Sequence, residues 1–157
     1  MFKKITRQID TVVIHYLATH LAWSDQFKSD WRRMVVEVRR WHKARGWRDI
    51  GYHYVVAPDG SILVGRDINQ IGAGVRGHNT GAVHIAYSGG IDARGIQGID
   101  TRTEEQREAL YKFVDDLEEE LGRKLRVVGH NDLAETLCPG FNVRLDRNAW
   151  LLEKKRF

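Results

Sequence analysis

The chain has 157 residues, a length that suits a single domain and is sufficient to bury a hydrophobic core. Hydrophobic residues make up 42% of the chain and charged residues 29%, which are ordinary globular values and exclude a disordered or fibrous protein. The net charge of +4 is compatible with an anionic polymer as partner, whether nucleic acid or cell wall, and selects neither. The only cysteine, Cys138, excludes a disulfide within the chain.

The beginning of the chain has no pattern of a targeting segment. The basic start MFKKITRQID is followed by no apolar stretch, and no apolar run reaches the length of about 18 residues that a membrane span needs. We therefore expect no secretory signal, no membrane span, and synthesis in the cytoplasm. If the protein acts elsewhere, another factor must release it.

Short β-branched and aromatic runs alternate with segments of helical periodicity. In chain order, the pattern predicts a strand at 11–16, a helix at 30–45, a hairpin with strands at 51–57 and 61–64, a strand at 82–87, a helix at 103–121, a strand at 125–128 and a short helix from Asp146. Thr103 and Gln106 have the spacing of a capping box at the start of the long helix. This order predicts one α/β domain over residues 1–157, with a mixed central β-sheet flanked by helices on both faces.

Two of the seven histidines lie at the carboxyl ends of predicted buried strands. His15 comes after the apolar run at 12–14 and His130 after the strand at 125–128, and open α/β sheets place their ligands at such strand ends. Cys138 lies in the loop HNDLAETLCPG that begins at His130. Two imidazoles and a thiolate suit zinc, and three protein ligands leave the fourth position open, as in a catalytic site. The alternative is that Cys138 is a small buried hydrophobe and both histidines are incidental, and the spacing alone does not decide.

Four segments together form a more specific pattern than any one of them. They are IHYLAT at 14–19, WHKARGWRDIGYHYVVAPDGSILVGRD at 41–67, GHNTGAVHIAYSGG at 77–90 and VGHNDLAETLCPGF at 128–141. In this order they resemble the zinc-dependent N-acetylmuramoyl-L-alanine amidases of the type 2 family, which includes short phage lysozymes of amidase type and the peptidoglycan recognition proteins. The resemblance extends from about residue 10 to about residue 150.

The resemblance implies one zinc ion per chain, held by His15, His130 and Cys138, and a catalytic tyrosine at Tyr52 in GYHY. It also implies cleavage of the amide bond between N-acetylmuramic acid and L-alanine in peptidoglycan, with a substrate groove over the metal. The central sheet would have about six strands and lie between helices. Zinc can acidify a water molecule and act as a Lewis acid, while the phenol of Tyr52 can donate to the oxyanion.

Two departures from the family pattern concern the reaction. Thr136, two residues before the cysteine, stands where the phage amidases usually have lysine. The amidase-active recognition proteins also have threonine there, so we expect the hydroxyl of Thr136 to orient water or the oxyanion without supplying positive charge. The strand at 82–87 has no carboxylate where a more distant branch has a glutamate base. The general base therefore stays open between proton loss to solvent, Glu135 and a second histidine.

Further polar residues fall within the resembling segments. His42 ends the aromatic helix, and His78 and Asn79 lie in the loop before the strand at 82–87. We predict that these three line the groove, because polar loop residues suit a substrate of sugar hydroxyls and peptide amides. His84 replaces the glycine that the family usually has, and we expect it to pack against its neighbours.

These features predict a zinc-dependent endolysin with peptidoglycan as its partner. We expect a monomer, made in the host cytoplasm, that acts on the cell wall after the membrane is permeabilised. The alternative is a non-catalytic peptidoglycan-binding module of the same fold, although such modules usually lack the cysteine that is present here as Cys138. Nucleic acid is not expected, because the basic residues at 32–45 suit a solvated helix face and no recognition motif accompanies them. A host protein as a second partner stays undecided.

Overall fold

The computed structural model describes residues 2–155, and its centre is a five-stranded sheet in the order β4-β3-β5-β1-β7. The strands are β1 (Thr11–Tyr16), β3 (Tyr54–Val56), β4 (Ile62–Val64), β5 (Ala82–Tyr87) and β7 (Arg126–Gly129). Neighbouring strands run parallel except for β3 and β4, which form an antiparallel hairpin at one edge. A separate two-stranded sheet pairs β2 (Thr19–His20) with β6 (Gly90–Ile91).

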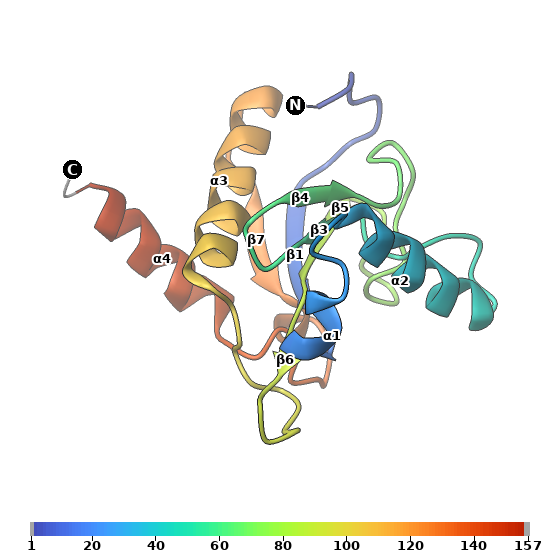
Figure 1. The fold of residues 1–157 in the computed structure, drawn as a ribbon. Coiled ribbons are helices and arrows are strands. Elements are labelled where there is room, and N and C mark those ends of the chain that lie inside the picture. Colours follow the sequence, from blue (N-terminus) through green and yellow to red (C-terminus); the bar gives the residue numbers. More distant parts are fainter. Residues whose placement is uncertain (1, 156–157) are drawn as a thin grey trace.

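Helices cover both faces of the central sheet, as Figure 1 shows. The helices α3 (Glu104–Leu121) and α4 (Val143–Lys154) lie on one side, and α2 (Arg32–Ala44) lies on the other. The short helix α1 (Leu21–Asp25) directly follows β2. The predicted fold class, a mixed sheet between helices, is confirmed, although the sheet has five strands where the resemblance implied one more.

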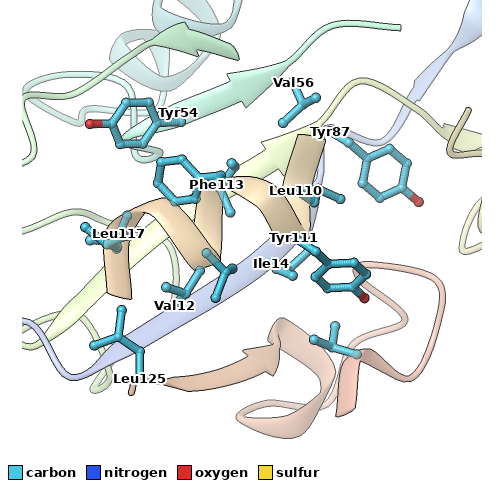
Figure 2. Close-up of a cluster of buried hydrophobic side chains, with 14 of the residues drawn as sticks. Val12, Ile14, Tyr54, Val56, Tyr87, Leu110, Tyr111, Phe113, Leu117 and Leu125 are labelled. Carbon is cyan, nitrogen blue, oxygen red and sulfur yellow. The ribbon is translucent and has the colours of Figure 1, made fainter. Parts of the chain in front are cut away.

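The main hydrophobic core lies between the sheet and the pair α3 and α4. Val12 and Ile14 of β1 belong to this core, and Figure 2 shows them beside the apolar side chains of α3. The core residues that the two helices contribute are Leu110, Tyr111, Phe113, Val114, Leu117, Val143 and Trp150. Because a fully buried side chain of this size contributes about 1.5–3 kcal/mol, this layer supplies much of the stability of the fold.

The opposite face of the sheet is covered first by α2. Met34, Val35 and Val38 recur at helical spacing and are buried with Val55 of β3 in a second apolar cluster. Ile50, in the segment after α2, is buried in the same cluster. Arg32, Arg33 and Arg40 of α2 are exposed, in agreement with the solvated face that the sequence predicted. Arg39, in contrast, is half-buried and donates to Asp49 and to the carbonyl of Gly65.

The long loop between β4 and β5 covers the rest of that face. Val75 from this loop is buried against the sheet. The guanidinium of Arg7, which precedes β1, donates hydrogen bonds to the carbonyls of Ile68, Thr80 and Ala82. Arg7 thus ties both ends of the loop to the segment that leads into the central strand.

Several boundaries differ from the sequence prediction for local reasons. The predicted strand at 51–57 is reduced to β3, so Tyr52 lies in the bend before the strand. The last helix begins at Val143 rather than at Asp146, because Asn142 caps it by accepting a hydrogen bond from the N–H of Leu145 at 3.1 Å. The elements α1, β2 and β6 were not predicted. Within residues 2–155, no helix is both long and apolar enough to cross a membrane.

The predicted capping box of α3 is present. The Oγ1 of Thr103 accepts the N–H of Gln106 at 3.0 Å, and Oε1 of Gln106 accepts the N–H of Thr103 at 3.0 Å. The amide nitrogen of Gln106 also donates to the carbonyls of Val56 and Ser88. The cap therefore joins the start of the helix to the sheet as well as closing its first turn.

Replacing this cap is expected to destabilise the protein without disturbing the sheet. Thr103→Ala should lower the free energy of unfolding by about 1 kcal/mol, because the N–H of Gln106 loses its acceptor. Urea denaturation followed by circular dichroism measures the change. Thr103→Ser retains the hydroxyl and is the matched control, so equal losses in the two variants would contradict the role of the cap.

Candidate metal centre and active site

Three metal-ligating side chains come together at the carboxyl ends of β1 and β7. Ile14 and Gly129 are the last paired residues of these two strands, so His15 and His130 follow side by side, with ring centroids 4.9 Å apart. Cys138 approaches from the loop that precedes α4. One ligand atom from each of the three residues lies within 4.8 Å of the others. The structure thus brings together the three predicted ligands.

The donor set fits a zinc ion. The Nδ1 of His15 lies 3.8 Å from Sγ of Cys138. Tetrahedral zinc–nitrogen and zinc–sulfur bonds would place two such atoms about 3.5 Å apart, so a small side-chain adjustment would suffice to close the set around an ion. In the described part of the chain, this is the one group of histidine, cysteine or acidic side chains with such geometry.

The protonation states of the two histidines suit metal ligands. Burial, together with the neighbouring histidines, lowers the pKa of His15 well below its usual range, and burial lowers the pKa of His130. Both rings are therefore neutral, which is the form that binds metal. Burial raises the pKa of Cys138 to about 12, although the N–H of Tyr16 donates to its Sγ at 3.3 Å. A bound cation would oppose this effect and stabilise the thiolate.

The loop that carries Cys138 is held by backbone hydrogen bonds. The N–H of Asn131 donates to the carbonyl of Cys138 at 2.8 Å, and the hydroxyl of Tyr87 donates to the carbonyl of Pro139 at 2.7 Å. The Oγ1 of Thr136 accepts the N–H of Cys138 at 3.3 Å. Because this oxygen acts as an acceptor toward the backbone, its own proton can be donated elsewhere.

Tyr52 lies beside the metal-ligating group. Its ring centroid is 5.0 Å from that of His15 and 5.3 Å from that of His42. Its carbonyl accepts the N–H of Arg66 at 2.8 Å, which fixes the bend before β3. Burial raises the pKa of Tyr52 well above its usual value, so the phenol stays protonated and can act as a hydrogen-bond donor.

The group opens into a cavity of about 210 Å³. Four of the residues predicted to bind metal or act in catalysis line this cavity, namely Tyr52, His130, Thr136 and Cys138, whereas the buried His15 is not part of the lining. Its lining residues are Tyr16, Leu17, Ala18, Val38, Trp41, His42, Arg45, Tyr52, Gln97, His130, Thr136 and Cys138. A metal position, two hydroxyl groups and space for a ligand therefore share one hollow.

Seven of the twelve lining residues were not among the predicted site residues, and these seven include Trp41, Arg45 and Gln97. Trp41 of α2 and Arg45, the residue that caps the end of this helix, line the cavity together with His42. Their separation of four residues places them on one helix face, and this spacing could have identified them once His42 had been assigned. Gln97 lies in a loop without a local motif and reaches the cavity because its backbone forms a bridge with Ile91.

The residues predicted to bind substrate occupy different positions. His42 lines the cavity, while its Nδ1 accepts the N–H of Gly51 at 2.9 Å. His78 is exposed and Asn79 is half-buried, and the cavity lining includes neither of them. A role of these three residues in substrate binding stays a prediction.

His84 does more than pack against its neighbours. Its Nδ1 lies 2.9 Å from Nε2 of His15, and its Nε2 lies 2.8 Å from Oδ1 of Asn79. Its backbone N–H donates to Nδ1 of His53 at 2.9 Å. Burial lowers the pKa of His84 to about 3 and that of His53 to about 4, so both rings are neutral. Sequence reasoning missed this contact because strand register, not local spacing, brings the two rings together.

Known proteins share both the sequence pattern and the fold. A family model described as N-acetylmuramoyl-L-alanine amidase matches residues 5–141. The endolysin of Enterobacteria phage K11 is 36% identical over 110 residues, which are 70% of this chain and 72% of that protein. The solved endolysin amidase LysCS from Clostridium intestinale URNW has a TM-score of 0.70 and 25% identity, covering 92% of this chain and 84% of its own.

A recognition protein has the same fold. The solved complex of the peptidoglycan recognition proteins LCa and LCx with tracheal cytotoxin has a TM-score of 0.72 and 27% identity. The match covers 91% of this chain and 82% of that one. Because the amidase family model covers most of the chain and a phage endolysin is 36% identical to it, the chain belongs to the N-acetylmuramoyl-L-alanine amidase family.

Proposed function

We propose that this chain is a single-domain, zinc-dependent endolysin that hydrolyses the amide bond between N-acetylmuramic acid and L-alanine in peptidoglycan. The observation that carries the proposal is the gathering of His15, His130 and Cys138 beside Tyr52 at one cavity. Family membership supports the reaction and the substrate, since the matched relative from phage K11 is an endolysin. The setting follows from the same likeness: synthesis in a host cell and action on its wall after the membrane is permeabilised.

The roles of the site residues follow from their chemistry. His15, His130 and Cys138 would hold one zinc ion, which when bound supplies Lewis acidity and lowers the pKa of a water molecule. The protonated phenol of Tyr52 would donate to the oxygen of the scissile carbonyl as negative charge develops on it. The hydroxyl of Thr136, with its oxygen bonded to the N–H of Cys138, would donate toward water or the same oxygen.

The lining of the cavity favours an amide over a glycosidic bond. None of the described residues that line it is acidic, whereas glycosidases usually need a pair of carboxylates on either side of the bond. Glu135, one of the candidate bases, is exposed and lies outside this lining. Burial lowers the pKa of His42 to about 4, which makes it a weak base. We infer that the proton of the attacking water passes to solvent.

The first prediction concerns the metal. Purified protein should contain about one zinc ion per chain, and Cys138→Ala should lose most of it, because two histidines alone form an incomplete site. Elemental analysis after dialysis measures the content. His20→Ala removes an exposed histidine close in sequence to His15 and is the control, which should retain its zinc. Equal zinc in Cys138→Ala and the control would contradict the assignment.

The second prediction concerns the bond that is cleaved. Digestion of purified sacculi should release new L-alanine amino termini and leave the glycan strands intact, and a chelator should stop the release. Labelling of amino groups and assay of reducing sugars distinguish the two kinds of new end. New reducing ends without new amino termini would show that a glycosidic bond is cleaved. Binding of sacculi without any new end, with zinc present, would favour the non-catalytic binding module.

The third prediction separates catalysis from binding. Tyr52→Phe should lower kcat about a hundredfold or more and leave binding of sacculi nearly unchanged, because the phenol acts mainly on the transition state. Thr136→Ala should cost about tenfold, since water can partly replace a neutral hydroxyl. Tyr54→Phe, on the adjacent strand in the main core, is the matched control. Activity of Tyr52→Phe within twofold of wild type, with zinc retained, would remove this tyrosine from the mechanism.

A further inference from the structure

A line of hydrogen bonds leads from Asn79 through His84 to the proposed metal ligand His15. In the parallel pair β1 and β5, His15 lies opposite Ala86, so His84, two residues earlier, points to the same face of the sheet. The Nδ1 of His84 lies 2.9 Å from Nε2 of His15. Its Nε2 lies 2.8 Å from Oδ1 of Asn79.

The direction of these hydrogen bonds follows from Oδ1 of Asn79, which can only accept a hydrogen bond. The amide of Asn79 is oriented by its Oδ1, which accepts the N–H of Gly74 and the N–H of Val75, each at 3.0 Å. The same oxygen faces Nε2 of His84, so that nitrogen must carry the proton. A neutral imidazole has one N–H, and Nδ1 of His84 is therefore an acceptor.

The same logic fixes the ring of His15. Its Nε2 donates to Nδ1 of His84, which leaves the lone pair on Nδ1 of His15. That atom faces Sγ of Cys138 at 3.8 Å. The hydrogen bonds thus leave Nδ1 of His15 unprotonated, and this is the nitrogen that faces the proposed metal position.

We propose that His84 is a positioning residue that, oriented by Asn79, holds the ring and the tautomer of His15 in the form that binds the metal. The inference rests on the proposed function for the identity of the metal. Histidines that bind metals usually donate their other N–H to a carboxylate, a carbonyl or water, and the loss of such a partner weakens metal binding. Here a second imidazole, itself fixed at its far nitrogen, takes that place.

The surroundings of His84 are shaped to its ring. A Cβ at Gly74 would overlap Nδ1 of the ring, and a Cβ at Gly72 would lie 2.9 Å from its Cδ2, so the loop passes close enough only because both residues are glycine. On another side the ring of His53 lies parallel to it, with centroids 5.9 Å apart. The ring therefore has little freedom to rotate away from His15.

Two substitutions separate the acceptor from the volume of the side chain. His84→Leu fills the space without an acceptor and should weaken zinc binding about 10- to 100-fold. His84→Asn can present Oδ1 near the position of the lost Nδ1 and should recover most of the affinity. Val75→Ala, which loosens the same loop but retains every hydrogen bond of the line, should bind zinc as wild type does. Competition with a fluorescent chelator measures each zinc dissociation constant, and thermal unfolding verifies each fold.

A second measurement does not depend on bound metal or on activity. Long-range proton–nitrogen correlation spectra of the metal-free wild type should show Nε2 protonated and Nδ1 unprotonated in both His15 and His84. A proton on Nδ1 of His15 would overturn the inference, as would zinc binding by folded His84→Leu within about twofold of wild type. If His84→Leu does not fold, the spectra of the wild type decide. Absence of zinc binding by the wild type would instead overturn the proposed function, while the tautomers would still test the line of hydrogen bonds.

Discussion

The parallel register between β1 and β7 is the constraint on which the site depends. Ile14 pairs with Gly129, and the next residue in each segment is a histidine. The strand pairing itself therefore brings the two rings together, independently of any loop conformation. The burial of β1 on both faces makes this register costly to shift. If the register of β1 shifted by one residue, the side chain of His15 would point into the main core and that of Ile14 would point to the opposite face of the sheet, where the polar site lies.

The buried histidines around the site are tolerated because their ring nitrogens have partners. His15, His53 and His84 are buried, and their ring nitrogens face one another, a backbone group or the amide of Asn79. Unpaired, each of these groups would cost about 1–3 kcal/mol. The Sγ of Cys138 accepts the N–H of Tyr16 and faces Nδ1 of His15, yet burial still raises the pKa of its thiol. A cation at this position would oppose that effect and stabilise the thiolate.

The sequence was most informative where local chemistry decides the structure. Thr103 and Gln106 predicted the start of α3 correctly, and the apolar run before His15 predicted a strand end with a polar residue on it. It was least informative where distant segments meet. The two-residue strands β2 and β6 exist only through each other, Gln97 reaches the cavity through a backbone bridge, and His84 meets His15 through strand register. None of these contacts corresponds to a recognisable residue spacing in the sequence.

The hydrogen bonds of Arg7 show that residues before β1 also support the site. Arg7 donates to the carbonyls of Thr80 and Ala82, which closely follow Asn79 in the chain. Residues 3–6 add an ion pair from Lys3 to Asp67 and a hydrogen bond to Asn69. A protein trimmed to its first strand would therefore keep His15, His130 and Cys138 and lose these supporting contacts. The contacts that support the site thus extend upstream of the first element of secondary structure.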